Sequence, residues 1–119
     1  EEISNTYDNT ILYTDYFLSK VIGLLKNNTK FESAMFYMGD HGESLGENGV
    51  YLHGMPYSIA PEAQTHVGAV MWLSGGVDAL KAKENTPYSQ DSLFHTVLGL
   101  MKIETSVYKP ALDILKTPQ

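Results

Sequence analysis

The sequence contains no cysteine, so its composition indicates neither an oxidising nor a reducing compartment. Basic residues are also few. Lys and Arg together number 8 against 14 Asp and Glu, which gives a formal net charge of −6, and the basic residues form no cluster beyond the spaced Lys81 and Lys83. A groove for nucleic acid needs concentrated positive charge, so we expect no nucleic-acid partner.

Long hydrophobic runs are absent as well. The longest apolar run has about six residues, far fewer than the ~20 that a membrane-spanning helix needs. The chain does not open with a basic stretch followed by an apolar one, as a signal peptide would. We therefore expect the chain itself to be soluble. Its opening, Glu1-Glu2-Ile3, predicts a piece of a longer protein.

The composition that remains is that of an ordinary globular protein. Of the 119 residues, 43% are hydrophobic and 18% are charged, which suits a folded domain rather than a disordered or fibrous chain. The sequence shows no internal repeat, no low-complexity block and no linker that would divide it. We therefore assign residues 1–119 to a single domain.

Two segments are predicted to be helical because their apolar residues recur every three or four positions. The first covers about residues 7–26 and the second residues 90–101. The apolar positions that form the two stripes are Ile11, Leu18, Val21, Ile22 and Leu25, and then Leu93, Phe94, Val97, Leu98 and Met101. Each stripe predicts one helix face turned toward a partner.

Two further segments, residues 33–38 and residues 67–73, are apolar without alternation, which is typical of strands buried on both faces. A third, short strand is considered at one of two places, near Tyr51-Leu52 or near Val107-Tyr108. Two doubly buried strands are too few for a stable parallel sheet, because their edges and faces need partners. The chain is therefore predicted to be part of a larger α/β sheet, to which it supplies two or more strands and two main helices.

The residues that carry chemistry lie in a glycine-rich segment, residues 39–54, directly after the first predicted strand. In open α/β sheets, sites are built at the carboxyl ends of strands. Asp40 and His41 offer a carboxylate oxygen and an imidazole nitrogen side by side, and Glu43 and His53 follow in the same segment. Together they predict a divalent-metal site whose nitrogen and oxygen donors suit zinc.

Other loop types do not fit this segment. A calcium-binding EF-hand needs alternating acidic residues, and a phosphate-binding P-loop needs Gly-Lys-Ser/Thr after its glycines. An Asp-His-Gly triplet alone would be a weak indication of a metal, because Asp and Gly are common turn residues. The prediction therefore depends on the longer string.

That string runs Asp40-His41-Gly42-Glu43-Ser44-Leu45-Gly46-Glu47-Asn48-Gly49 and continues with Tyr51-Leu52-His53-Gly54-Met55-Pro56 and Ala60-Pro61. It is joined by Tyr7-Asp8-Asn9-Thr10-Ile11 with Tyr13-Thr14-Asp15, and by Phe94-His95-Thr96-Val97-Leu98-Gly99-Leu100. The whole pattern closely resembles bacterial phosphoethanolamine transferases, including the lipid A-modifying enzymes and the mobile colistin-resistance proteins. The resemblance covers nearly the entire chain.

The resemblance implies a fold and a place within it. These transferases belong to the sulfatase branch of the alkaline phosphatase superfamily. We therefore expect an alkaline phosphatase-like α/β sandwich with a central, mostly parallel sheet flanked by helices. Residues 1–119 would be the C-terminal portion of the catalytic domain.

The resemblance also implies the roles of the site residues. In the family a zinc ion is held by a Glu, by the Thr that serves as nucleophile, and by an Asp-His pair that matches Asp40 and His41. His53 would match a histidine that lines the phosphate or a second zinc, and Glu43 an acidic residue near the ethanolamine amine. Both are thus expected to bind substrate.

The nucleophilic Thr and the first zinc Glu have no counterpart in this sequence. The early threonines, Thr6, Thr10 and Thr14, fall on the first predicted helix or at its start. We therefore expect no catalytic nucleophile in this chain, no activity from the chain alone, and pairing of its exposed sheet edge with the missing N-terminal part or with a second copy.

The function implied by the resemblance is transfer of phosphoethanolamine from phosphatidylethanolamine to lipid A or another surface glycan, through a phospho-Thr intermediate. Family members are anchored in the inner membrane with their catalytic domain in the periplasm, so the same location is expected for the longer protein of which this chain is predicted to be a piece. Two alternatives stay open: another superfamily enzyme, such as a phosphoglycerol transferase or a sulfatase, and a non-catalytic module that binds a metal or a partner.

The two remaining histidines are interpreted as structural. His66 lies in a polar stretch and is expected at the surface, whereas His95 follows Phe94 on the last predicted helix and is expected to be hydrogen-bonded within the fold. Trp72 is expected to contribute to packing.

Overall fold

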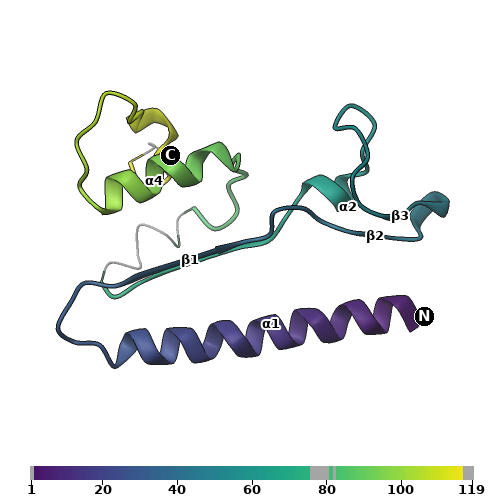
Figure 1. The fold of residues 1–119 in the computed structure, drawn as a ribbon, viewed down its shortest axis with the longest axis horizontal. Coiled ribbons are helices and arrows are strands. Elements are labelled where there is room, and N and C mark those ends of the chain that lie inside the picture. Colours follow the sequence, from purple (N-terminus) through teal and green to yellow (C-terminus); the bar gives the residue numbers. More distant parts are fainter. Residues whose placement is uncertain (1, 76–80, 82, 117–119) are drawn as a thin grey trace. The chain divides into compact units, whose positions relative to one another are not determined.

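The computed structural model describes residues 2–75, 81 and 83–116, which form helices and short strands (Figure 1). The chain divides into two compact units, residues 1–75 and residues 76–119. The strands described in the structure all lie in the first unit, and helix α4 lies in the second. The α/β class predicted from the sequence is confirmed.

Helix α1, Glu2–Lys26, contains the whole predicted segment and begins five residues before it. The hydroxyls of Thr6, Thr10 and Thr14 donate to backbone carbonyls three or four residues earlier in the same helix, at 2.7–2.9 Å. These threonines therefore lie on the helix, as predicted, and their hydroxyls already have partners there. Among the helices that the structure describes, none combines the length and apolar character needed to cross a membrane.

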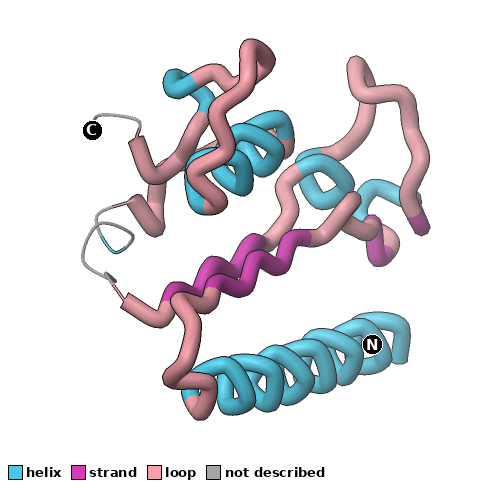
Figure 2. Tube along the Cα trace, turned by 60° about the vertical axis from the view of Figure 1, so that its left-hand side comes forward, coloured by secondary structure: helices cyan, strands magenta, loops and turns pink. Residues whose placement is uncertain are grey.

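The main strands are β1, Ala34–Met38, and β4, Ala69–Leu73, both slightly shorter than the predicted segments. They pair antiparallel, with Ala34 opposite Leu73 and Met38 opposite Ala69 (Figure 2). The chain leaves β1 and returns to the same end of the pair, whereas a parallel arrangement would need a crossover to the other end. The direction of this pair therefore differs from the mostly parallel pairing expected for the complete sheet.

The faces of the two strands are not buried, although their apolar runs predicted burial on both sides. The side chains of β1 and β4 are exposed or half-buried, and no apolar side chain in the described part of the chain is buried. Two strands and their connections cannot cover both faces of a sheet. The chain therefore shows strands without the larger sheet that the sequence predicted around them.

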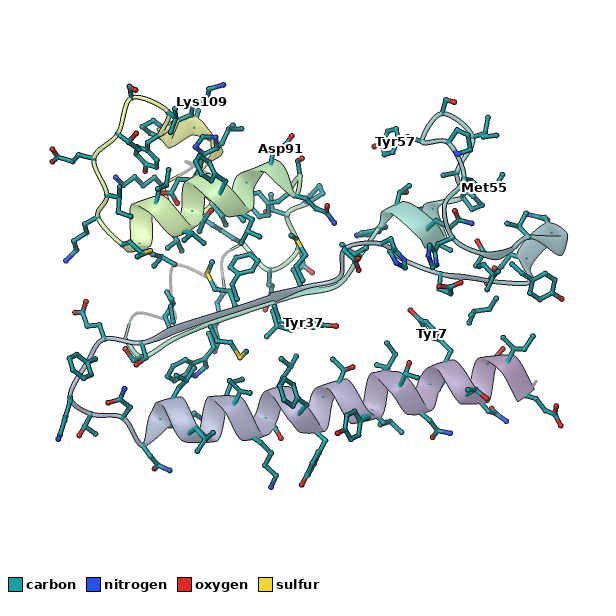
Figure 3. The ribbon with its side chains drawn as sticks, in the orientation of Figure 1. Tyr7, Tyr37, Met55, Tyr57, Asp91 and Lys109 are labelled. Atoms are coloured by element: carbon teal, nitrogen blue, oxygen red, sulfur yellow. The ribbon has the colours of Figure 1, made fainter. Side chains whose placement is uncertain are left out.

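The second unit is organised around helix α4, Asp91–Leu100, which matches the helix predicted at residues 90–101. Its buried residues are polar. His95 is 7% exposed, and its Nδ1 accepts a hydrogen bond of 3.1 Å from the backbone N–H of Lys109. Lys109 and Asp91, at the start of α4, are labelled in Figure 3. Thr96 is fully buried; its hydroxyl donates to the Ser92 carbonyl at 2.7 Å and accepts from the backbone N–H of Ile114 at 3.0 Å. The loop after α4 is thus fastened to the helix by hydrogen bonds.

Asp113, which follows the short 3-10 helix η2, Pro110–Leu112, completes this polar network. Its carboxylate is 1% exposed and accepts hydrogen bonds from the Tyr108 hydroxyl at 2.7 Å and from the backbone N–H of Leu115 at 2.9 Å. The hydrogen bond to the Asp113 carboxylate raises the pKa of Tyr108, because it stabilises the protonated phenol. The prediction of a short strand near Val107-Tyr108 is wrong, because these residues form a turn and the start of a loop.

Candidate metal centre

The candidate site is built on the excursion between β1 and β4. It opens with a small hairpin in which β2, Ser44–Leu45, pairs antiparallel with β3, Tyr51–Leu52, across the 3-10 turn η1, Glu47–Gly49. Helix α2, Glu62–Thr65, follows before the chain returns to β4. The short strand considered at Tyr51-Leu52 is confirmed. The glycine-rich segment is therefore not a featureless loop but a hairpin at the carboxyl end of β1.

Backbone conformation explains why this hairpin is rich in glycine. Gly46 has a φ of 120°, a region that other residues rarely adopt. A side chain there would also meet the ring of Tyr51 at 2.9 Å, so that ring lies against bare backbone. Asn48 and Leu52 have φ values of 54° and 65°, which is uncommon for residues with side chains. The turn therefore depends on residues that tolerate left-handed backbone, and Leu52 pays a conformational cost in it.

Gln64 of α2 holds the hairpin in place. It is 5% exposed, and its side-chain amide donates to the Ser44 hydroxyl at 2.9 Å and accepts from the backbone N–H of Met55 at 3.3 Å. The backbone carbonyl of Gln64 accepts a hydrogen bond from the backbone N–H of Gly42 at 2.9 Å. Sequence reasoning missed both Gln64 and α2, and the available signal was weak: Pro61 followed by Glu62, a combination common at helix starts.

Asp40 and His41 lie just beyond the end of β1. The Nδ1 of His41 is 2.9 Å from the Gly42 carbonyl, which can only accept, so the ring proton belongs on Nδ1. The Nε2 of His41 lies 3.9 Å from Oδ1 of Asp40. Two metal–ligand bonds of about 2.1 Å can span that separation, so one ion can reach both atoms.

Glu43 and His53 flank the hairpin, next to the pair formed by Ser44 and Leu52. The Oε2 of Glu43 lies 2.9 Å from Nδ1 of His53. The imidazole of His53 also stacks on that of His41, with ring centroids 3.7 Å apart and planes inclined by 26°. The hairpin therefore brings together residues ten and twelve positions apart in the sequence.

The donors of His41, Glu43 and His53 form one cluster. One ligand atom from each lies within 4.8 Å of the others. The Oε1 atom of Glu43 is buried and has no hydrogen-bond partner in the described part of the chain, so it is left to accept from a cation or a donor. Imidazole nitrogens and carboxylate oxygens are ligands that zinc prefers, so the chemistry around His41 suits such an ion.

The side chain of Asp40 is 94% exposed and stands at the edge of this cluster, whereas the side chains of His41 and His53 are nearly half exposed. A neighbouring carboxylate, Glu47, serves the turn: its own backbone N–H and that of Leu45 lower its pKa by hydrogen bonding to the ionised form. The structure thus brings all four predicted site residues to one end of β1, and gives Glu47 a structural partner.

The two histidines interpreted as structural are placed as expected. The side chain of His66 is 73% exposed, with Nδ1 3.3 Å from Oε1 of Glu62, which is itself exposed. His95 is buried and hydrogen-bonded within the second unit. Neither belongs to the donor cluster, which contains only His41, Glu43 and His53 in the part of the chain that was described.

Curated relatives share most of this chain. Phosphoethanolamine transferase EptA of Salmonella typhimurium is 52% identical over 98% of the chain, and EptA of Helicobacter pylori is 44% identical over 98%. Phosphatidylethanolamine transferase Mcr-1 of Escherichia coli is 37% identical over 92% of the chain. The chain spans only 20–23% of the length of these relatives. The resemblance to phosphoethanolamine transferases is confirmed.

Solved structures are similar in fold as well as in sequence. The C-terminal periplasmic domain of phosphoethanolamine transferase EptC from Campylobacter jejuni has a TM-score of 0.90 at 55% identity, over 93% of this chain and 37% of that one. The soluble domain of lipooligosaccharide phosphoethanolamine transferase A from Neisseria meningitidis has a TM-score of 0.90 at 47% identity, over 98% of this chain and 38% of that one.

A family model named Sulfatase matches residues 1–103, which is most of the chain. The matched residues include both main strands and the whole donor cluster. The chain therefore belongs to the sulfatase family.

Proposed function

We propose that this chain is the C-terminal part of the catalytic domain of a zinc-dependent phosphoethanolamine transferase. The observation that carries the proposal is the gathering of Asp40, His41, Glu43 and His53 at the end of β1, in a chain whose relatives are named phosphoethanolamine transferases. The longer protein that would contain this chain, the parent protein, would transfer the group from phosphatidylethanolamine to lipid A or another surface glycan.

Asp40 and His41 are the proposed zinc ligands in this chain. Support comes from the 3.9 Å between Oδ1 and Nε2, and from the Gly42 carbonyl, which holds the ring proton of His41 on the opposite nitrogen. A bound zinc ion would lower the pKa of a nucleophilic hydroxyl and neutralise negative charge on the phosphate. The remaining ligands would come from parts of the parent protein outside this chain.

His53 and Glu43 are the proposed substrate-binding residues. His53 lies against the ring of His41, so a group bound beside the zinc ligands is within its reach. Glu43 has one buried carboxylate oxygen without a partner in the described residues, and an ethanolamine ammonium would supply the missing donor and a compensating charge. Both residues would thus act on the phosphoethanolamine group rather than on the metal.

The nucleophile is proposed to be a Thr of the parent protein that lies outside residues 1–119, and transfer would proceed through a phospho-Thr intermediate. The threonines of α1 have hydroxyls bonded to helix carbonyls, which supports a nucleophile elsewhere. We accordingly expect residues 1–119 alone to show no transfer. The periplasmic face of the inner membrane is the proposed location of the parent protein's catalytic domain.

The test is transfer by the purified parent protein from a fluorescent phosphatidylethanolamine to lipid A, followed by mass spectrometry of the acceptor. His53→Ala should lower transfer by about 100-fold or more while leaving most of the zinc bound. Hydrolysis of an aryl sulfate without any transfer would identify a sulfatase instead. A His53→Ala protein that loses its zinc, and regains normal turnover when zinc is restored, would contradict the proposed role of His53.

A further inference from the structure

The hairpin register places Glu43 and His53 side by side. Ser44 pairs with Leu52, and the two residues in question flank that pair on the same end of the hairpin. Their contact is short, with 2.9 Å between Oε2 of Glu43 and Nδ1 of His53. Glu43 is also the less exposed partner, at 23% of its side chain against 46% for His53. A half-buried carboxylate therefore contacts one nitrogen of a ring that is nearly half exposed.

This contact fixes the position of the ring proton. An ionised carboxylate has no proton to donate, so in the neutral ring the proton must be on Nδ1 of His53. Nε2, at the opposite edge, then carries a lone pair and accepts hydrogen bonds. The arrangement matches that of a histidine whose second nitrogen is oriented by a carboxylate partner, a device that sets both ring orientation and tautomer.

We infer that Glu43 is a positioning residue that acts through His53, holding the imidazole in the tautomer whose Nε2 accepts a hydrogen bond from the bound substrate. The inference rests on the proposed function for the identity of that substrate. It assigns Glu43 a second role in addition to the proposed contact with the ethanolamine amine, since the two roles use different oxygens: Oε2 contacts His53, and Oε1 is left without a partner in the described residues.

A double-mutant cycle in the parent protein separates the two roles. Glu43→Ala should lower kcat by about 10- to 100-fold, as removal of an orienting partner does, with zinc content unchanged. In the His53→Ala background the same change should lower kcat by a clearly smaller factor, because only the proposed contact of Oε1 with the ethanolamine amine is then lost. Independent, multiplying effects of the two substitutions on kcat would overturn the inference.

Two further variants calibrate the cycle. Glu43→Gln keeps an oxygen that can accept from Nδ1, so it should retain more activity than Glu43→Ala. Glu62→Ala is a matched control, because Glu62 contacts His66 in a second Glu–His pair that is exposed on α2, and it should leave kcat unchanged. Equal losses in Glu43→Gln and Glu43→Ala would contradict positioning by an accepted hydrogen bond.

Nitrogen NMR of the parent protein labelled with 15N-histidine reads the tautomer without any need for turnover. His53 should show a protonated Nδ1 and an unprotonated Nε2 in the unsubstituted protein, and this pattern should be lost in Glu43→Ala. A neutral His53 protonated on Nε2 in the unsubstituted protein would overturn the inference. Absence of phosphoethanolamine transfer would refute the proposed function alone, because the NMR pattern would still decide the role of Glu43.

Discussion

Histidines of the two units are hydrogen-bonded in opposite ways. In the second unit His95 is buried, and its Nδ1 accepts from the backbone N–H of Lys109, so its proton lies on Nε2. In the first unit, Nδ1 of His41 faces a carbonyl and Nδ1 of His53 faces the Glu43 carboxylate, so in both neutral rings the accepting lone pair lies on Nε2.

The difference shows how one side chain serves structure in one place and chemistry in another. The acceptor nitrogen of His95 is hydrogen-bonded within the fold, and the residue is buried. His41 and His53 instead use their N–H groups for hydrogen bonds within the protein, and their side chains are nearly half exposed. Metal ions and substrate hydroxyls need such an accessible lone pair. The ring nitrogen that is left to accept, and its exposure, therefore distinguish the histidines of the candidate site from His95 of the structural network.

The largest contrast is expected between His41→Ala and His95→Ala in the parent protein. His41→Ala should lower transfer by more than about 100-fold together with zinc content, because changes around a ligand already cost about 10- to 100-fold. His95→Ala should instead lower Tm, since the part-buried backbone N–H of Lys109 loses its partner. Transfer assays, zinc analysis and calorimetry measure these effects. A loss of bound zinc in folded His95→Ala protein would contradict the assignment of His95 to the structural network.

A smaller effect is expected from Gly42→Ala, which disturbs the support of the site and not its donors. The added methyl group would meet the backbone carbonyl of Ala63, next to the hydrogen bond from Gly42 to Gln64. Such overpacking costs about 1–3 kcal/mol, and α2 must move to relieve it. We expect a lower Tm and a transfer rate reduced by about tenfold.

Gly68→Ala is the matched control for Gly42→Ala, because a methyl group there meets no atom within 4 Å. It should leave both Tm and transfer close to their original values. An unchanged Gly42→Ala protein would mean that α2 is not fixed to the hairpin as described.

Thr96→Val probes the polar network of the second unit. The substitution keeps the shape but removes a fully buried hydroxyl that bonds to Ser92 and Ile114. Leaving the part-buried backbone N–H of Ile114 without this partner should lower the free energy of unfolding by about 1–3 kcal/mol, with kcat and zinc content unaffected. Denaturant unfolding measures the loss, and Thr96→Ser, which keeps the hydroxyl, should recover most of it.

The smallest effect is expected from His66→Ala. This side chain is 73% exposed and contacts the exposed carboxylate of Glu62, so the free energy of unfolding should change by less than about 0.5 kcal/mol. Transfer should be unchanged. A marked loss of transfer would place His66 in the site and extend the comparison to a third histidine of the first unit.

Much of the fold was predictable because it depends on local pattern. The helices at Glu2–Lys26 and Asp91–Leu100 follow from apolar residues at helical spacing, and the strands at Ala34–Met38 and Ala69–Leu73 from continuous apolar runs. Helix α2 was not predicted, since its four polar residues carry no periodicity and are held by contacts of Gln64 with distant residues. The antiparallel direction of the strand pair was equally beyond local pattern.

The sequence by itself determined which donors are present and that Asp40 and His41 follow a strand, because chain adjacency fixes both. Only the tertiary structure decided that Glu43 contacts His53, that His53 stacks on His41, and which nitrogen of each ring is left free. These facts depend on the register of a two-residue hairpin. A shift of one position would turn each side chain to the opposite face, and nothing in the local sequence specifies that register alone.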